Sequence, residues 1–316
     1  MSDHEVWSGI RRIMTCLRLA AAIQFGIDRS IEEIRELTDR ITPAKSLVGV
    51  LALVSSLASP CAVASSILTE TIAGRKAIVY LPENLAPAGS RALVVVLHGG
   101  MGNAERIATL RSEGSMNMNA VADEGGFIVA YLNGTRVSRA LGPHMFGWNA
   151  GSCCGLPVDD RVDDVAYLTQ AIGALIGRHG IDRHRVFGVG HSNGAMMTQR
   201  MLCETGVYAA AVPIAGGLET GVAQCPAGQG KRIMAIHGAD DRNVPLAGGR
   251  GKGLARVDFA SQAATGAVWH RSGAIFDLQV IAGADHSVDT INAQIVKTES
   301  QSLAQKMARF FGLLGR

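Results

Sequence analysis

The sequence predicts an α/β fold with a mostly parallel sheet and helices on both faces. Three observations lead to this prediction: short apolar runs rich in β-branched residues, longer segments with helical spacing between them, and regular alternation of the two. In sheets of this kind, ligands bind beyond the carboxyl ends of the strands. We therefore expect catalytic residues directly after strands.

The expected elements follow from local pattern. Asp163–His179 begins with acidic residues, which suit the positive end of a helix, and then places apolar residues near helical spacing. The other predicted helices are Asn193–Thr205 and Thr298–Leu314. The predicted strands are Ala77–Leu81, Ala92–Leu97, Gly126–Tyr131, Arg185–Gly190, Ala209–Ala215, Arg232–His237 and Ile275–Ile281.

Composition is typical of a globular enzyme. Of the 316 residues, 47% are hydrophobic and 18% are charged, which is enough apolar material for a large core. The 30 basic and 27 acidic residues form no long block of one sign, so a nucleic-acid partner is not expected. There are no internal repeats, and nothing in the sequence predicts a second domain.

The N-terminal region has the pattern of a secretory signal. Lys45 precedes a short apolar core that ends in the small residues Ala62-Val63-Ala64. The unbroken apolar part, Leu47–Leu57, is shorter than the roughly 20 residues of a permanent membrane anchor, which is the alternative. We expect residues 1–64 to be an N-terminal extension and signal peptide, and residues 65–316 to be a secreted or periplasmic catalytic domain without a stable membrane span.

The cysteine number predicts disulfides if the chain is exported. Six cysteines are present, and cleavage after Ala64 would leave four: Cys153, Cys154, Cys203 and Cys225. An even number in an exported chain predicts two disulfides. Bonding between sequence neighbours needs strained geometry, so we expect Cys153 and Cys154 each to bond to Cys203 or Cys225. The alternative is four buried free thiols.

The stretch "GVGHSNGAMM" places Ser192 between Gly190 and Gly194. This pentapeptide pattern arises by chance in glycine-rich chains, and a plain structural turn is the alternative interpretation. Its context is more specific, because a predicted strand precedes the serine and a predicted helix follows it, as a nucleophile elbow requires. We therefore expect Ser192 to be a catalytic nucleophile.

A serine nucleophile needs a base that is oriented by an acid, and in this context the chain order is serine, acid, histidine. Asp240 and Asp241 follow a predicted strand, and the residues alone do not decide between them. His237 precedes both acids, which leaves His270 and His286 as candidate bases. His286 follows a strand and a small-residue loop, so it is the expected base.

The oxyanion of the reaction needs backbone N–H donors. The residue after the nucleophile, Asn193, supplies the first. The second is expected from the glycines of "VVVLHGGMGNA", with Gly100 favoured over Gly99, and a plain glycine turn is the alternative. Histidines and cysteines show no zinc spacing and no phosphate loop is present, so neither a metal nor a cofactor is expected.

Several further stretches extend the pattern between Lys76 and His286: "LVVVLHGG", "GWNAGSCCG", "VDDVAYL", "AAAVPIAGG" and "IHGADDRNVP". Together with the serine motif, they resemble the secreted α/β-hydrolase esterase family of polyhydroxybutyrate depolymerases and feruloyl esterases. The resemblance implies an α/β-hydrolase fold with Ser192 as nucleophile, Asp241 as acid and His286 as base. It thereby decides between the two aspartates.

The same resemblance implies that Trp148 lies near the acyl site, with a core tryptophan as an equal alternative. It also implies that disulfides pin the loop that carries the cysteine doublet. His98 and His191 adjoin the two glycine motifs and are expected to contact substrate. The chain departs from the family after His286, where Ser287-Val288 replace the usual tryptophan and proline, and this departure concerns the substrate more than the reaction.

These expectations combine into a secreted serine carboxylic ester hydrolase. The expected partners are ester substrates, either hydroxyalkanoate oligomers or aromatic acyl esters. Two alternatives stay open: a peptidase or amidase with the same triad, and an inactive binding protein that retains the fold.

Overall fold

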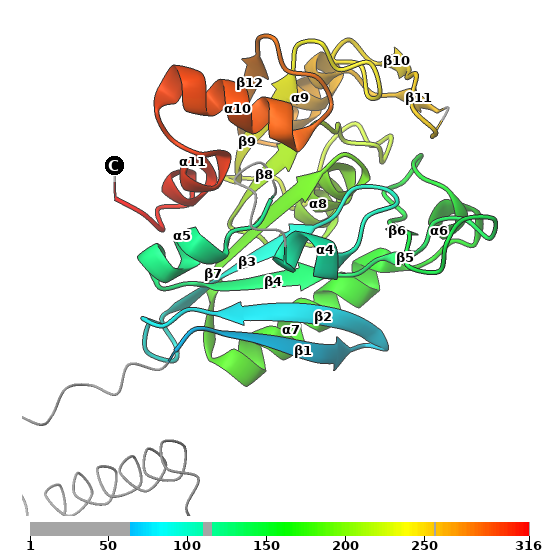
Figure 1. Ribbon diagram of the computed structural model, residues 1–316. Coiled ribbons are helices and arrows are strands. Elements are labelled where there is room, and N and C mark those ends of the chain that lie inside the picture. The colour runs from blue at the N-terminus through cyan, green and yellow to red at the C-terminus, as the bar shows by residue number, and fades with distance from the viewer. Residues whose placement is uncertain (1–63, 110–115, 256, 316) are drawn as a thin grey trace, which may run out of the picture. The chain divides into compact units, whose positions relative to one another are not determined.

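The computed structural model describes residues 64–109, 116–255 and 257–315, and the part from Ala64 onward is one compact unit. Its centre is an eight-stranded sheet with the order β1-β2-β4-β3-β7-β8-β9-β12 (Figure 1). β1 and β2 are antiparallel to their neighbours, whereas the strands from β4 to β12 are parallel. The predicted α/β fold is confirmed.

The predicted strands lie where the sequence places them, with ends that differ by a few residues. The sheet strands are β1 (Ser66–Ile72), β2 (Arg75–Leu81), β3 (Arg91–Leu97), β4 (Ile128–Leu132), β7 (Ile181–His191), β8 (Ala210–Ile214), β9 (Arg232–Gly238) and β12 (Ile275–Ile281). Two short pairs lie outside the sheet: β5 (Thr135–Arg136) with β6 (Phe146–Gly147), and β10 (Gly249–Arg250) with β11 (Asp258–Phe259).

Helices cover both faces of the sheet. One apolar core packs under α7 (Asp164–His179), α8 (Asn193–Glu204) and α9 (Gln262–Arg271). The other packs under α4 (Ala104–Thr109), α5 (Asn119–Gly125), α10 (Val288–Glu299) and α11 (Leu303–Phe310), and a short helix α6 (Leu156–Asp159) lies in a loop. β3 serves both cores, because side chains alternate faces along a strand: Leu93, Val95 and Leu97 enter one core, and Val94 and Val96 enter the other.

The predicted helix Thr298–Leu314 is wrong, because the chain forms two helices there. α10 ends at Glu299, and Ser300 then adopts a left-handed conformation with φ of 54°. Ser302 begins α11 with a capping box, in which its hydroxyl accepts from the Gln305 N–H and the Gln305 side chain accepts from the Ser302 N–H. Local capping therefore outweighs the continuous helical spacing.

The predicted signal peptide, with Cys16 and Cys61, lies outside the described residues, and the proposed boundary at residue 64 stays a prediction. No helix in the described part of the chain is both long enough and apolar enough to cross a membrane.

Candidate active site

The Ser192 turn joins the central strand β7 to helix α8. Ser192 has φ of 54° and ψ of −123°, a strained conformation for a residue with a side chain. The flanking glycines permit this turn, because a Cβ on Gly190 would collide with the Gly194 carbonyl, and one on Gly194 would collide with the carbonyls of Leu97 and His98. The turn thus has the strand-turn-helix geometry that a nucleophile elbow requires, and the role of Ser192 as nucleophile stays a prediction.

Three predicted side chains from distant parts of the chain meet at this elbow. His286 Nε2 lies 3.0 Å from Ser192 Oγ, and His286 Nδ1 lies 2.7 Å from Asp241 Oδ2. Asp241 follows β9 and His286 follows β12, so all three residues lie beyond the carboxyl ends of parallel strands. This arrangement allows the imidazole to accept the serine proton while the carboxylate fixes its orientation.

Asp241 is held in place by four donors. Its Oδ1 accepts from the backbone N–H groups of Asn243 and Val244, each at 2.9 Å, and its Oδ2 faces His286 and His237. Burial raises the pKa of the Asp241 carboxyl, but the hydrogen bonds from His237 and His286 outweigh burial and hold that pKa below its ordinary value. The acid of the site is therefore a carboxylate across the working pH range.

The loop that carries His286 is fixed by hydrogen bonds to its neighbours. His191, the last residue of β7, donates from Nε2 to the His286 carbonyl at 2.8 Å, and the two rings lie 4.9 Å apart. Burial and the nearby His286 lower the pKa of His191 to about 4, so the ring is neutral at pH 7. His191 thus holds the loop that carries His286, and its expected contact with substrate stays a prediction.

The predicted oxyanion donors lie beside the elbow. A Cβ added to Gly100 would lie 3.9 Å from Asn193 Cβ, which brings the two predicted residues together. The next N–H along the chain, that of Met101, already donates to Phe146 at 2.8 Å. The roles of the Gly100 and Asn193 N–H groups as donors to a developing oxyanion stay predictions.

Trp148 and His98 lie beneath the site and do not line it. Trp148 is fully buried, and its Nε1–H donates to the His98 carbonyl at 2.9 Å. His98 is also buried, its Nε2 accepts from the Gly134 N–H, and its Nδ1–H donates to the Gly99 carbonyl. Since neither side chain has free surface, the expected substrate contacts are corrected to core positions. They support the oxyanion loop from below.

Asn193 has a second role that its sequence position did not indicate. Its side-chain Oδ1 accepts from the Trp148 N–H at 2.7 Å, and its Nδ2 donates to the Trp148 carbonyl at 3.0 Å. The residue after the nucleophile thus fastens the Trp148 segment to the start of α8. Its side chain is used for structure, and the oxyanion role of its backbone N–H stays a prediction.

The predicted cysteine pairing is wrong. Cys203 on α8 bonds to Cys225, with the two Cα atoms 4.7 Å apart, and Cys153 and Cys154 are paired with each other. The loop around Cys225 passes directly beside the end of α8, because the Ala227 N–H donates to the Cys203 carbonyl. Cys203 and Cys225 thereby become each other's nearest partners.

The two competing candidates lie elsewhere. Asp240 is exposed next to the acid but makes no contact with His286, and its N–H donates to the Ala284 carbonyl. His270 is exposed on α9 and contacts Phe276. Two residues that the sequence reasoning missed are close to the acid: His237, which chain order removed from the search for a base, and Gln262, which had no recognisable signal.

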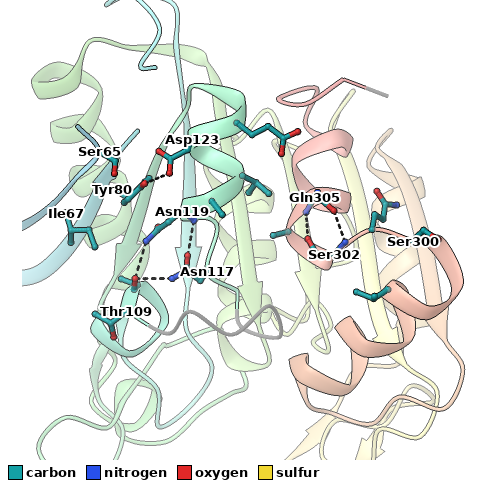
Figure 2. Close-up of a pocket in the computed structure, with 17 residues that line it drawn as sticks. Ser65, Ile67, Tyr80, Thr109, Asn117, Asn119, Asp123, Ser300, Ser302 and Gln305 are labelled. Atoms are coloured by element: carbon teal, nitrogen blue, oxygen red, sulfur yellow. Dashed lines mark hydrogen bonds between the residues drawn. The ribbon is translucent and has the colours of Figure 1, made fainter. Parts of the chain in front are cut away.

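A cavity of about 1020 Å³ lies apart from these residues, between α5, α11 and the antiparallel strands β1 and β2 (Figure 2). Tyr80, which donates to Asp123 at 2.6 Å, and the Ser302 cap of α11 are part of its wall. No triad residue lines it. This cavity is therefore separate from the residues of the predicted chemistry.

Solved structures with a similar chain path define the fold. An S-formylglutathione hydrolase from Agrobacterium tumefaciens matches with a TM-score of 0.53 and 13% identity, over 79% of this chain and 95% of that one. A puromycin-hydrolyzing peptidase of Mycobacterium tuberculosis matches with a TM-score of 0.55 and 17% identity, over 80% of this chain and 40% of that one. Acetyl xylan esterase from Aspergillus awamori matches with a TM-score of 0.50 and 17% identity, over 79% of this chain and 100% of that one. The chain has the α/β-hydrolase fold.

Within that fold, the sequence matches are esterases. The chain is 30% identical over 162 residues to "Putative esterase NocK" of Nocardia uniformis subsp. tsuyamanensis, across 50% of this chain and 42% of that protein. It is 29% identical over 179 residues to feruloyl esterase B of Piromyces equi, across 55% of this chain and 31% of that protein. The matched part spans less than half the length of either relative. No protein-family model matches the chain. The predicted resemblance to α/β-hydrolase esterases is confirmed.

Proposed function

We propose that this protein is a serine carboxylic ester hydrolase that uses Ser192, His286 and Asp241 as its triad. The observation that carries the proposal is the continuous hydrogen-bonded series from Asp241 through His286 to Ser192, with contacts of 2.7 and 3.0 Å. The sequence relatives named as esterases support ester hydrolysis as the reaction. Neither observation depends on the other.

In the proposed mechanism, Ser192 Oγ attacks the ester carbonyl carbon while its proton moves to His286 Nε2. The carbonyl oxygen becomes an oxyanion that accepts from the N–H groups of Gly100 and Asn193. As the tetrahedral species collapses, the alcohol leaves with the proton from His286. Water then attacks the acyl-serine by the same route, which releases the acid and restores the serine.

An apolar acyl group is the substrate feature that the surface around the oxyanion loop favours. Met101, directly after Gly100, is 40% exposed, and the Phe146 segment that accepts its N–H also presents Met145 and Leu141 to solvent. Exposed methionines adapt to apolar groups of varied shape. We therefore favour soluble esters of hydroxyalkanoate oligomers or aromatic acids, and the Cys203–Cys225 disulfide supports an exported protein.

A fluorophosphonate probe tests the mechanism. The wild type should be labelled on Ser192 and should hydrolyse p-nitrophenyl esters, whereas Ser192→Ala should do neither. Asp241→Asn and His286→Ala should each lower kcat by about 10³-fold or more. The chain offers matched controls, since Asp240→Asn and His270→Ala change the neighbouring candidates and should leave kcat unchanged.

A substrate panel then separates the alternatives. Rates on feruloyl, acetyl-xylan, short p-nitrophenyl and hydroxybutyrate-oligomer esters identify the acyl preference, and the best acyl group is then compared as ester and as anilide. Faster cleavage of the anilide would replace esterase by amidase or peptidase. No labelling of the wild type would indicate an inactive binding protein and overturn the proposal.

A further inference from the structure

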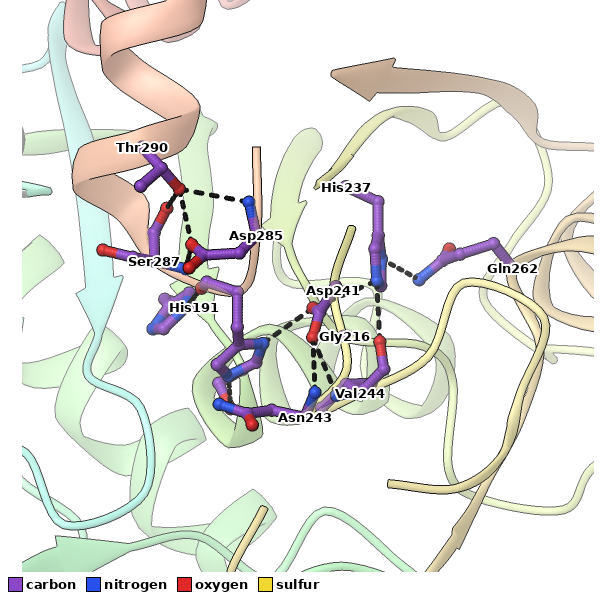
Figure 3. Close-up of polar contacts among 12 residues, drawn as sticks. His191, Gly216, His237, Asp241, Asn243, Val244, Gln262, Asp285, Ser287 and Thr290 are labelled. Carbon is purple, nitrogen blue, oxygen red and sulfur yellow. Dashed lines mark hydrogen bonds and ion pairs between the residues drawn. The ribbon is translucent and has the colours of Figure 1, made fainter. Parts of the chain in front are cut away.

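Three buried groups form a chain of contacts behind the acid (Figure 3). His237, the penultimate residue of β9, is 1% exposed, and Gln262, at the start of α9, is 3% exposed. Gln262 Nε2 lies 3.0 Å from His237 Nδ1. His237 Nε2 lies 2.9 Å from the Val244 carbonyl and 3.2 Å from Asp241 Oδ2. The contacts therefore run from α9 to the carboxylate without a gap.

These contacts define which nitrogen of His237 carries the proton. An amide N–H only donates, so His237 Nδ1 accepts from Gln262 and the proton of the neutral ring is on Nε2. That Nε2–H faces two acceptors, the Val244 carbonyl and Asp241 Oδ2. The other tautomer would direct a lone pair at both oxygens. The two oxygens therefore make His237 a donor to the acid, and the Gln262 N–H supports this tautomer at Nδ1.

Asp241 Oδ2 is shared by two imidazoles, because it also lies 2.7 Å from His286 Nδ1. A donor on that oxygen withdraws negative charge from the contact with His286 and restricts rotation of the carboxylate. The Val244 turn closes the arrangement, since its N–H donates to Asp241 Oδ1 and its carbonyl accepts from His237. Among the described residues, the ionisable groups that face Asp241 are thus His237 and His286, with His191 and Asp285 beyond them.

We propose that His237 is a positioning residue that holds Asp241 and tunes the basicity of His286, with Gln262 supporting its tautomer. This inference rests on the proposed triad. A core histidine that only fills space is the competing explanation. It predicts that a shape-preserving apolar change at His237 affects stability alone.

The test uses His237→Leu, which removes the donor, and His237→Gln, which can place an amide N–H near the position of Nε2. Loss of the donor leaves more negative charge on Asp241 Oδ2, so the pKa of His286, followed by NMR of its ring, should rise by about 0.5 to 1. The lower apparent pKa in the pH profile of kcat/KM should rise by the same amount. His237→Gln should return this value and the pKa of His286 towards those of the wild type. Tyr208→Phe, another buried change whose hydroxyl has no partner, is the control and should leave both unchanged.

The NMR titration keeps this inference separate from the proposed function, because it needs no turnover. If the protein hydrolysed no ester but the pKa of His286 still rose in His237→Leu, the proposed ester hydrolysis would be refuted. The proposed role of the contact between His237 and Asp241 would still be supported. If His237→Leu does not fold, Gln262→Leu removes the donor that holds His237 Nδ1 and loosens the ring, so it should raise the pKa of His286 in the same direction, by less. An unchanged His286 titration in a folded His237→Leu or Gln262→Leu protein, or equal shifts in His237→Leu and His237→Gln, would overturn the proposal.

Discussion

The two halves of the site are built differently. The nucleophile half lies at the end of β7, in the middle of the sheet between β3 and β8, where the preceding strand residues Val186–Gly190 are buried. The base half follows β12, an edge strand on which Ile275 is 66% exposed and Val280 is 46% exposed. Close packing fixes the first half. Hydrogen bonds with His191 and Asp241, and those within the Asp285 loop, fix the second.

This difference determines whether a substitution mainly lowers the stability of the fold or mainly displaces a side chain of the site. A change in the packed half needs backbone atoms to move, so its cost falls on folding. A change in the hydrogen-bonded half removes one contact among several, so its cost is smaller and falls on the position of the base. The following changes examine that contrast, from the largest expected effect to the smallest.

Gly190→Ala should have the largest effect. The new Cβ would collide with the Gly194 carbonyl and Thr198 Oγ1, which are held by the helix and cannot move independently. We expect a loss of about 3 kcal/mol or more in the free energy of unfolding, or no folded protein. Urea unfolding followed by circular dichroism measures it.

Gly177→Ala is the matched control. Gly177 lies in α7 with open space around the position of a Cβ, so alanine should stabilise the protein by about 0.5–1 kcal/mol. Equal unfolding curves for Gly190→Ala and the wild type would contradict the packed elbow.

Loss of the Cys203–Cys225 disulfide should come next. The bond ties the end of α8, the helix that begins at the nucleophile, to a loop at a sequence separation of 22. The double variant Cys203→Ala, Cys225→Ala should lose about 3 kcal/mol of unfolding free energy, because the unfolded chain regains conformational freedom. Ester hydrolysis by the folded fraction should be unchanged at 25 °C. A stability equal to that of the wild type would show that the bond does not form.

The packed half should also be sensitive to acid through His98. Burial lowers the pKa of His98 from 6.5 to about 4. The unfolded chain therefore binds more protons than the folded one between these values, so this contribution is fully present above pH 6.5 and is lost as pH falls towards 4. Between pH 7 and pH 5 it should cost about 2 kcal/mol.

The comparison that isolates this term is the wild type against His98→Gln, with urea unfolding at both pH values. The variant should be less stable at pH 7 but lose less stability on acidification. A variant that loses as much as the wild type would place the acid sensitivity elsewhere.

The same contrast explains which parts of the fold the sequence predicts. β3, β4, β7, β8 and β9 are buried, and their apolar, β-branched runs identify them to within a few residues. β1, an edge strand with mostly exposed side chains, has no such run and was missed. The break between α10 and α11 depends on a left-handed serine, which helical spacing does not encode.

Motif and chain order identified Ser192 and His286, and the family resemblance chose Asp241 over Asp240; the structure brings these three side chains together. The supporting contacts were not predictable in this way. His237 and Gln262 are 25 positions apart, and their contact depends on how α9 packs against β9. The cysteine pairing likewise depends on where the Cys225 loop passes α8. Trp148 could be assigned to the core only once its burial was known.

Thr290→Val should have the smallest effect, and it falls in the hydrogen-bonded half. The Thr290 hydroxyl donates to Asp285 Oδ1 at 2.6 Å and accepts from the Asp285 N–H at 3.2 Å, one residue before the base. Valine keeps the shape and removes these bonds. We expect a loss of about 1 kcal/mol or less in unfolding free energy and a fall in kcat of less than about tenfold, because His191 and Asp241 still hold His286.

Thr298→Val on the same helix is the matched control, since its hydroxyl only donates back to the Gln294 carbonyl and should not affect kcat. The informative measurement is the ratio of the two kcat values alongside their unfolding free energies. If Thr290→Val lowered kcat by about 10³-fold, the loop alone would position the base, and the redundancy attributed to the hydrogen-bonded half would be wrong. If both variants lost equal stability and kept kcat, the Asp285 loop would serve only to begin α10. An intermediate loss of kcat, confined to Thr290→Val, is what several weak contacts acting together on one imidazole should produce.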